Sequence, residues 1–541
     1  MAFSPRLERC LLSVALFAAC LLGPSAVKAT PFWSPDYDIS EGDVSDTYTS
    51  LNNQRFAAVD DSNNLYITFF DDRNKAGLDD NFEIYIRRFT YNFGSPYITR
   101  VTNASNPSRY PSIAILNWGQ NDIPTQQDSA RVYIAWQDAR LFSVPTVGAP
   151  ASYTIFFRTF QSKGGVGFGP EIQVSPYDSL NAATAPVLTV GDSSRVWIVY
   201  TKQNGGLGDL YTAVYHSNTR VMDPPQPLET DPGTGASLPT VAATRDGVVN
   251  VVWADTRNGS RPQLFWRKFV PGSGWTAAQQ IVSTPGTSTA TAPSLIATYN
   301  GHLHLTWRDN RDGNSEIYYK EYVPGVGWDA VDTRVTVNSF TQIEPQVDAD
   351  PANNVYLVWT DLRNGSSNPD IYYTTREAGV WQPEISLVGA GTDTTNQVQH
   401  FPGITHDVVG ATYVTWSDDR LPATFGRNHD VFYKVGYGFT TAVPTSEKPS
   451  LARLLRNYPN PFNPATTVEF TLDRDAMASL RVYDVSGRLV RTLLDSYLAA
   501  GRRSLTWDGR DDAGHGVASG AYFLRLEAGG RYLSRTVNLL K

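Results

Sequence analysis

The sequence predicts an all-β protein, in which a seven-bladed β-propeller is followed by a smaller β-sandwich. Three observations predict this fold. A strand–turn–strand unit carrying an Asp-x-Arg pair recurs along most of the chain, its apolar residues follow the two-residue period of a strand, and the composition changes near residue 440. Gly (42) and Pro (34) are frequent, as many short strands joined by turns require.

The first 29 residues have the layout of a secretion signal. Arg6 and Arg9 precede an apolar stretch at 11–22, and small residues near Ala29 offer a cleavage point. The apolar stretch is too short to cross a membrane as a helix. We therefore predict a signal peptide over 1–29 and a secreted or cell-surface protein.

The mature chain is acidic and lacks cysteine. Cys10 and Cys20 both lie in the predicted signal, so no disulfide is expected. Removing the signal takes three basic and one acidic side chain from totals of 45 and 53, which leaves a net charge of −10. That charge argues against nucleic acid and anionic membranes as partners, and no further apolar run is long enough to span a bilayer.

Each repeat is an apolar strand that ends in an aromatic residue, followed by Asp, Arg, a turn and a second aromatic strand. The clearest copy runs from Val355 through Trp359 to Tyr373. The repeated pairs are Asp71/Arg73, Asp138/Arg140, Asp255/Arg257, Asp309/Arg311, Asp361/Arg363 and Asp418/Arg420, with a decayed copy at Lys202/Asn204. Seven copies at blade-like spacing predict seven blades over residues 30–438.

Each unit is interpreted as four strands. The second strand, such as 355–359, is apolar on both faces, which the stacking of blades would bury. We place the first strand after a proline, because a proline that opens a strand removes no ladder donor; these are Pro111, Pro186, Pro239, Pro293 and Pro345. The fourth strand is weak, and the last unit lacks one. Residues 32–40 resemble the fourth-strand segment 380–386, so we expect the N-terminus to complete the last blade and close the ring.

A polar, proline-containing linker at 439–451 separates the propeller from a second domain at 452–541. This domain contains the motifs NYPNPFNP at 457–464, LRVYDVSGR at 480–488, WDGRDDAG at 507–514 and SGAYFLR at 519–525. These motifs resemble the FlgD-like immunoglobulin fold and the type A sorting domains of type IX secretion. The resemblance implies a seven-stranded immunoglobulin-like sandwich and contact with export machinery, and a purely structural appendage is the alternative.

The Asp-x-Arg pairs could ring one face of the propeller and bind a ligand. A feature repeated in nearly every blade serves the blade more often than a ligand, so we interpret them as structural. The Asp can accept backbone N–H groups in the turn, and the Arg can pair with an adjacent blade's Asp.

A ligand site is expected where the symmetry fails. The loops after Arg73, Arg140 and Arg420 are longer than the other four, and they belong to blades that become neighbours when the ring closes. They contain the candidate ligand-binding residues Asp79, Asp80, Phe142, Phe425 and Arg427. Neutral variation of loop length is the alternative.

Catalytic motifs are absent from the sequence. The propeller loosely resembles sialidase-like (BNR-type) repeat proteins, which implies an Arg triad, a Tyr nucleophile and an acid/base carboxylate, but the Ser-x-Asp-x-Gly-x-Thr-Trp boxes of that family are missing. No cofactor or metal motif is present, and we assign no catalytic residue.

Two functional hypotheses remain. The first is a non-catalytic binding or scaffold protein for an extracellular glycan or protein. The second is a secreted glycoside hydrolase or polysaccharide lyase. A pair of carboxylates about 5–10 Å apart in the central cavity would favour the hydrolase, and a cavity lined only by the repeated apolar and Asp-x-Arg positions would favour binding. A monomer is expected in either case.

Overall fold

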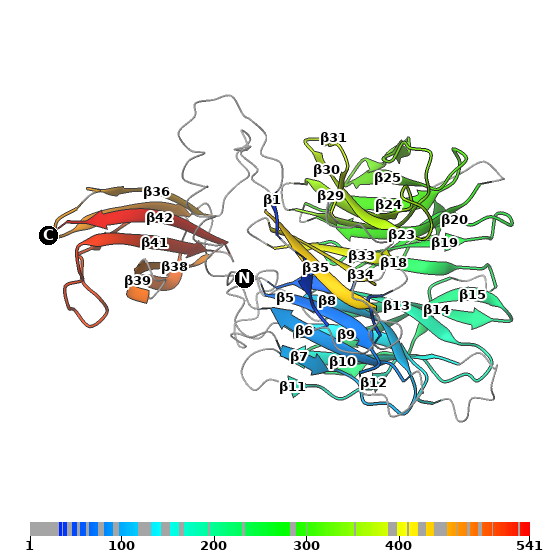
Figure 1. Ribbon diagram of the computed structural model, residues 1–541. Helices are drawn as coiled ribbons and strands as arrows, with labels where there is room; N and C mark the ends of the chain where they lie inside the picture. Colours follow the sequence, from blue (N-terminus) through cyan, green and yellow to red (C-terminus); the bar gives the residue numbers. More distant parts are fainter. Residues whose placement is uncertain are drawn as a thin grey trace.

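The computed structural model describes residues 32–437 and 452–540 of the chain. Excepted within these ranges are residues 35, 41–45, 51–54, 61–63, 74–80, 90–96, 117–130, 142–151, 162–166, 193–194, 230–232, 282–287, 299, 351–352, 388–397, 408–410, 420–428, 461, 473–475, 485–488, 500 and 529–530. All described secondary structure is β (Figure 1). The predicted signal peptide and linker lie outside the described residues. No helix in the described part is long and apolar enough to cross a membrane.

Seven sheets of one general design form the blades. Blade 1 contains β3 (Thr47–Tyr48), β4 (Ala57–Val59), β5 (Leu65–Asp71), β6 (Glu83–Phe89) and β7 (Tyr97–Arg100). Blade 2 contains β8 (Ser108–Leu116), β9 (Arg131–Asp138), β10 (Thr154–Gln161), β11 (Gly167–Phe168) and β12 (Ile172–Gln173). Blade 3 contains β13 (Ala183–Asp192), β14 (Arg195–Asn204), β15 (Leu207–His216), β16 (Val221–Met222) and β17 (Gln226–Pro227). Blade 4 contains β18 (Ser237–Ala243), β19 (Val249–Asp255), β20 (Gln263–Val270), β21 (Gly274–Trp275) and β22 (Gln279–Gln280).

The remaining blades repeat this design. Blade 5 contains β23 (Ala290–Ala297), β24 (Leu303–Asp309), β25 (Glu316–Val323), β26 (Gly327–Trp328) and β27 (Thr333–Arg334). Blade 6 contains β28 (Gln342–Ala349), β29 (Val355–Asp361), β30 (Asp370–Glu377), β31 (Val380–Trp381) and β32 (Ile385–Ser386). Blade 7 contains β33 (Gln399–His406), β34 (Ala411–Asp418) and β35 (Asp430–Tyr437), together with β1 (Phe32–Trp33) and β2 (Tyr37–Asp38). In blades 2 to 7 the outer strand is broken into two short pieces that both pair with the third strand.

The innermost strands form a closed ring. Contacts run from β4 to β8, β13, β18, β23, β28 and β33, and from β33 back to β4. The ring is closed through the N-terminus, as predicted. Phe32 and Trp33 pair with Tyr437 and Gly436, and the next piece, β2, pairs with Tyr433 and Phe432. The last blade therefore has no free outer edge along these pairs.

A β-bulge interrupts six of the inner strands, which corrects the predicted role of the prolines. In β13, Thr184 pairs with Thr201 but Val187 pairs with Val199, so that Ala185 and Pro186 face a single residue. The residue before each bulge proline has a positive φ; these are Tyr110 (53°), Ala185 (52°), Leu238 (48°), Ala292 (53°), Glu344 (58°) and Phe401 (52°). The prolines thus lie inside their strands, at the bulge, where they lose no ladder hydrogen bond.

Burial between blades supplies the propeller core. The second strands β5, β19 and β34 are buried at every position, as the apolar runs predicted. The second strands β9, β19, β24, β29 and β34 each contribute one completely buried tryptophan: Trp136, Trp253, Trp307, Trp359 and Trp416. Side chains of neighbouring blades share the same clusters, so each blade is held mainly through its two faces.

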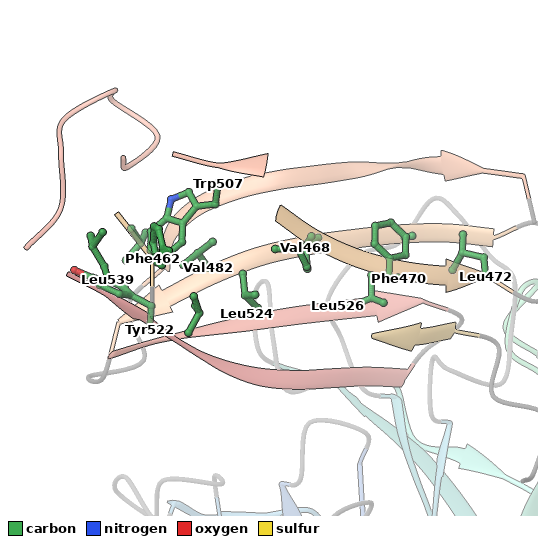
Figure 2. Packing of buried hydrophobic residues seen from close by; sticks show 14 residues of the cluster. Phe462, Val468, Phe470, Leu472, Val482, Trp507, Tyr522, Leu524, Leu526 and Leu539 are labelled. Carbon is green, nitrogen blue, oxygen red and sulfur yellow. The ribbon is translucent and has the colours of Figure 1, made fainter. Parts of the chain in front are cut away.

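The C-terminal domain is a sandwich of seven strands. One sheet contains β36 (Ala452–Tyr458), β37 (Thr466–Leu472) and β40 (Gly501–Trp507). The other contains β38 (Ala476–Asp484), β39 (Leu489–Leu498), β41 (Gly520–Ala528) and β42 (Arg531–Leu539). Figure 2 shows its apolar core, in which Trp507 lies beside Phe462 and Tyr522. Alternate residues of β37 are buried, the pattern of a strand with one face on a core.

Candidate functional site

The loop residues predicted to bind a ligand, Asp79, Asp80, Phe142, Phe425 and Arg427, lie outside the described residues. The three loops that carry them follow β5, β9 and β34, the strands that end in an Asp-x-Arg aspartate. These strands end at the same end of the propeller as the Asp-x-Arg turns, which we call the Asp-x-Arg face. The predicted ligand site remains a prediction.

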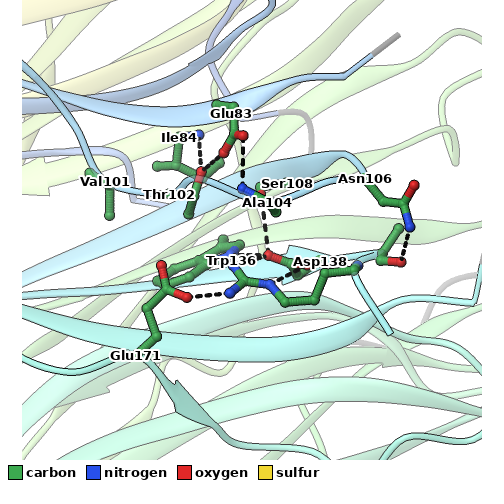
Figure 3. Close-up of polar contacts among 12 residues, drawn as sticks. Glu83, Ile84, Val101, Thr102, Ala104, Asn106, Ser108, Trp136, Asp138 and Glu171 are labelled. Atoms are coloured by element: carbon green, nitrogen blue, oxygen red, sulfur yellow. Dashed lines mark hydrogen bonds and ion pairs between the residues drawn. The ribbon is translucent and has the colours of Figure 1, made fainter. Parts of the chain in front are cut away.

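The Asp-x-Arg pair forms a compact polar cluster within each blade. In blade 2, Asp138 is completely buried and accepts hydrogen bonds from Trp136 Nε1 (2.9 Å) and Ser108 Oγ (2.9 Å). Arg140 donates its backbone N–H to the same carboxylate (2.8 Å) and adds two guanidinium bonds of 2.9 and 2.7 Å. Figure 3 shows this carboxylate surrounded by its donors. Its hydrogen-bonding capacity is used within the blade.

The same contacts recur in other blades. The indoles of Trp253, Trp307, Trp359 and Trp416 donate to Asp255, Asp309, Asp361 and Asp418 at 2.8–3.1 Å. The backbone N–H groups of Arg73, Arg257, Arg311 and Arg363 donate to the aspartates two residues earlier at 2.6–2.9 Å. Arg420 lies outside the described residues. A buried aspartate whose oxygens accept several hydrogen bonds within its own blade is not available to a substrate.

The arginines pair differently from the prediction. Arg140, Arg311 and Arg363 each bind the Asp of their own turn, and each also contacts an acidic residue at the outer strand of the same blade, namely Glu171, Asp332 and Glu384. Arg257 binds Asp255 and Glu229, which follows the outer strand of blade 3. None of these four pairs with the Asp of an adjacent blade, because the i, i+2 spacing already brings the two groups together.

Blade 3 lacks the cluster. Tyr200 replaces the tryptophan, and its buried hydroxyl has no hydrogen-bond partner among the described residues. Lys202 stands at the Asp position and lies 3.4 Å from Asp178, while Asn204 donates to Asp209 at 3.1 Å. The asymmetry predicted from the sequence is therefore a real difference in polar contacts.

The central channel is narrow and has no carboxylate among its described lining residues. Its cavity of about 20 Å³ holds little more than one water molecule. Hydroxyl side chains on the inner strands accept backbone N–H groups of the next blade, as Thr240 does from Leu295 and Ser294 from Val347, both at 3.2 Å. These bonds join blades 4, 5 and 6 around the channel.

Glu344 lies at the end of the channel that opens toward the Asp-x-Arg face. It precedes Pro345 in β28, and Gln346, which follows that proline, lines the channel. Its Oε2 accepts hydrogen bonds from Thr360 Oγ1 (2.8 Å) and from the backbone N–H of Phe401 in blade 7 (2.8 Å). Burial raises the pKa of the Glu344 carboxyl, although these donors and the charge of Arg308 act in the opposite direction.

Arg308 lies beside Glu344 and has no partner of its own. In blades 2 and 7 the residue between the aromatic residue and Asp is polar and contacts the next blade: Gln137 accepts the N–H of Ala185 (3.3 Å), and Ser417 accepts that of Thr49 (2.9 Å). Arg308 occupies this position in blade 5, and no hydrogen bond or ion pair to its guanidinium is found among the described residues. Burial lowers the pKa of Arg308, and the nearby Glu344 opposes that effect.

A second concavity lies at the rim between blades 4 and 5. This groove, about 360 Å³, is lined by Trp266, Tyr322 and Trp328 together with polar side chains. Trp266 packs at 5.5 Å from Tyr322 and 5.7 Å from Trp328. A similar group, Trp197 with Trp275 and Phe269, joins blades 3 and 4. We attribute the aromatic residues of the groove to packing between blades.

His302 and His304 belong to a polar network that joins blades 5 and 6. The fully buried His304 lies 2.7 Å from the Tyr319 hydroxyl and 3.1 Å from Asn353 Oδ1, and burial lowers its pKa to about 4. His302 contacts Glu321, which also binds Arg376 of blade 6. In the part of the chain that the structure describes, no group of three or more His, Cys, Asp or Glu is arranged to hold a metal.

Comparison with protein families identifies the smaller domain. Residues 463–531 match the FlgD Ig-like domain. The match lies within the predicted second domain and includes the 480–488, 507–514 and 519–525 motifs. The seven strands of this FlgD Ig-like domain agree with the immunoglobulin-like sandwich that the resemblance implied. No curated protein matches the chain.

Similar solved structures cover the propeller at low identity. A protein of unknown function from Dyadobacter fermentans is 12% identical over 74% of this chain and 99% of its own, with a TM-score of 0.40. The polysaccharide lyase Uly1 is 11% identical over 72% and 92%, with a TM-score of 0.44. PorZ, a surface component of the type IX secretion system of Porphyromonas gingivalis, is 10% identical over 90% and 81%, with a TM-score of 0.28. Similarity at this level transfers no activity to this chain.

Sequence reasoning did not select Arg308 and Glu344. The sequence did contain an indication of this site. Each of the seven repeats has one residue directly before the Asp position or its equivalent, and Arg308 is the only charged one. Glu344 is likewise the only acidic residue before a bulge proline. The structure brings these two departures from the repeat together at one place.

Proposed function

We propose that this chain is an exported, non-catalytic binding protein. Its propeller holds an extracellular glycan or protein on the Asp-x-Arg face, and its FlgD Ig-like domain contacts the export machinery and directs the chain to the cell surface. The signal-like segment 1–29 supports export. The loops of blades 7, 1 and 2 and the channel mouth with Glu344 would contribute to the binding face.

One observation carries the non-catalytic part of the proposal. The carboxylates that line this face at regular intervals are saturated by donors of their own blade, as Asp138 and Asp361 illustrate. Hydrolysis of a glycosidic bond by the usual route needs two available carboxyl groups about 5–10 Å apart. Nothing of this kind is found among the described residues that line the channel.

Glu344 favours the hydrolase or lyase alternative more than any other described residue. A buried carboxyl with a raised pKa is the form in which a general acid is used. The charged group that acts on its pKa is Arg308, and no second carboxylate takes part among the described residues. Among the residues that the structure describes, Glu344 therefore has no second carboxylate of the kind that an acid/base mechanism requires.

The proposal can be tested with the mature chain, residues 30–541. A glycan array is followed by incubation of every bound polysaccharide with the protein, and released reducing ends and unsaturated products are measured. We expect binding without release. Turnover of a bound polysaccharide would overturn the non-catalytic assignment, and failure to bind any glycan or any surface protein of a producing cell would overturn the binding assignment.

The role of the FlgD Ig-like domain needs a separate test. The full chain and a chain ending at residue 438 are expressed in a bacterium with type IX secretion, and each is located by cell fractionation. We expect the full chain at the surface or in the medium and the shortened chain in the periplasm. Equal distribution of the two chains would favour the structural-appendage alternative.

A further inference from the structure

Arg308 differs from the arginines of the Asp-x-Arg turns by having no partner. Arg140, Arg257, Arg311 and Arg363 each bind at least two carboxylates. No hydrogen bond or ion pair to the half-buried Arg308 guanidinium is found among the described residues. A guanidinium has five N–H donors. No Arg308 nitrogen is among the described buried polar atoms that lack a partner, so its donors face water and are open to the acceptors of a ligand.

The place of Arg308 suits a ligand. Arg308 occupies the position in its blade that Gln137 and Ser417 occupy in theirs. Those two side chains accept hydrogen bonds from the backbone of the next blade. The corresponding inner-strand residue beside Arg308 is Glu344, two residues before Gln346 in the channel wall. Arg308 and Glu344 act on each other's charge, yet no ion pair joins them in the described structure. Two opposite charges from blades 5 and 6 thus lie near each other without a direct ion pair.

The two groups have complementary needs. The guanidinium of Arg308 matches a planar carboxylate, which it can bind through two parallel hydrogen bonds. Oε2 of Glu344 already accepts from Thr360 and Phe401, which leaves Oε1 to accept from a hydroxyl group. A ligand that binds both Arg308 and Glu344 carries a carboxylate and a hydroxyl group at fixed positions on one small molecule.

We propose that Arg308 and Glu344 form a subsite for a uronic acid residue of an acidic glycan, with Arg308 on the sugar carboxylate and Glu344 on a ring hydroxyl. A neutral sugar would leave Arg308 without a carboxylate, and poly-glutamate has no hydroxyl group for Glu344 Oε1. This inference rests on the proposed binding function, because it names the ligand class of the same face.

Calorimetric titration tests the subsite. The mature chain is titrated with oligogalacturonate, oligoalginate and hyaluronan oligosaccharides, and with the carboxyl-reduced form of each. We expect binding of at least one acidic probe and at least tenfold weaker binding of its reduced form. Arg308→Gln should weaken binding by tenfold or more, Arg308→Lys by less, and Glu344→Gln by a few-fold. The matched control Arg245→Gln removes the same charge from the exposed turn between β18 and β19 and should leave affinity unchanged.

Several outcomes would overturn the subsite. These are the absence of binding by all three acidic probes, equal binding of the reduced forms, unchanged affinity in Arg308→Gln, or equal binding of poly-glutamate. Thermal unfolding of each variant separates loss of the site from loss of the fold. If a neutral glycan from the array binds the wild type and Arg308→Gln equally, the binding function stands and the uronic acid subsite does not.

Discussion

At the scale of single residues, buried polar groups with specified partners hold the blades in place. Asp361 is completely buried, yet it accepts the indole N–H of Trp359 and both the backbone and guanidinium N–H groups of Arg363. The hydrogen bond that Arg363 donates to Asp361 raises the pKa of Arg363, so the arginine stays charged despite its burial. The aspartate thereby joins the second strand to the turn that follows it.

Removing this carboxylate should destabilise the propeller strongly. Asp361→Ala leaves the indole N–H of Trp359 without an acceptor and the Arg363 guanidinium with Glu384 alone. Breaking one side of such a buried pair costs about 3–5 kcal/mol. Urea unfolding followed by tryptophan fluorescence measures the change. Asp223→Ala, which removes an exposed carboxylate beside His216, serves as the control and should cost no more than about 0.5 kcal/mol. A cost below about 1 kcal/mol for Asp361→Ala would contradict the structural role.

His304 should make stability depend on pH. Its pKa is about 4 in the folded state, below the value of 6.5 that it has when exposed, so the unfolded chain binds more protons between these two pH values. The stabilisation is fully present above pH 6.5 and is lost as the pH falls toward 4, with a total of about 3 kcal/mol. Stability curves between pH 7 and 4.5 should flatten in His304→Gln. The exposed His515→Gln serves as the control and should follow the wild type.

The sequence predicted these residue-scale features unevenly. The aspartates could be predicted because each recurs two residues after an aromatic residue. The second carboxylate bound by Arg140 could not, because Glu171 lies 31 residues away in the chain and its distance depends on where the outer strand folds back. The lack of partners at Arg308 could not be predicted for a similar reason, because the sequence does not show which side chains surround a residue in the fold.

At the scale of elements, the bulge is the main feature that the sequence concealed. Prolines marked the inner strands correctly, but the residue before them is Tyr, Ala, Leu, Glu or Phe, and none of these indicates a positive φ. Left-handed backbone at a residue with a Cβ is normally unfavourable, so the surrounding sheet must impose it. Tertiary pairing, with two residues facing one, therefore overrides local preference here.

Glycine at the bulge should relieve this strain. Ala292 has a φ of 53°, and Ala292→Gly removes the Cβ that makes this conformation costly. Ala297 lies in the same strand, is similarly half-buried and has no positive φ, so Ala297→Gly only adds chain entropy to the unfolded state. We expect Ala292→Gly to be neutral or stabilising and Ala297→Gly to cost about 0.5–1 kcal/mol in urea unfolding. An equal cost for the two variants would mean that the bulge stores no strain.

The closing strand could be predicted because its sequence copies that of an outer strand. Trp33 packs edge-on against Tyr373 of blade 6, at 5.0 Å, as the equivalent Trp381 packs against Tyr319 of blade 5. The Ser40 hydroxyl adds a hydrogen bond to Asp430 across the closure (2.9 Å). The N-terminal residues thus repeat the contacts of a regular blade.

A chain that begins at residue 41 should lose this closure. The outer edge of β35 would then be exposed, and an unpaired edge associates with other strands. We expect a lower melting temperature and concentration-dependent oligomers in light scattering, relative to a chain that begins at residue 30. A monomeric chain with unchanged melting would show that β1 and β2 contribute nothing to closure.

At the scale of the whole molecule, the sequence repeat made the propeller predictable, and the departures from that repeat contribute to the proposed binding face. Seven copies of one unit define the ring. The candidate loops after Arg73, Arg140 and Arg420 are longer than the loops of the other blades, so no other copy of the repeat indicates their structure. The Arg308 and Glu344 pair was equally out of reach, because it joins two exceptions that lie in different blades. Repeats thus predict architecture well and ligand contacts poorly.

The two domains should fold and act separately. The core of the FlgD Ig-like domain consists entirely of its own residues, from Phe462 to Leu539. The propeller clusters use residues of the blades alone. We therefore expect residues 452–541 to give a dispersed amide NMR spectrum by themselves, and residues 30–438 to keep the affinity of the mature chain for any bound glycan. Loss of binding in 30–438 with an unchanged melting temperature would assign part of the ligand site to the FlgD Ig-like domain, contrary to a site on the propeller face.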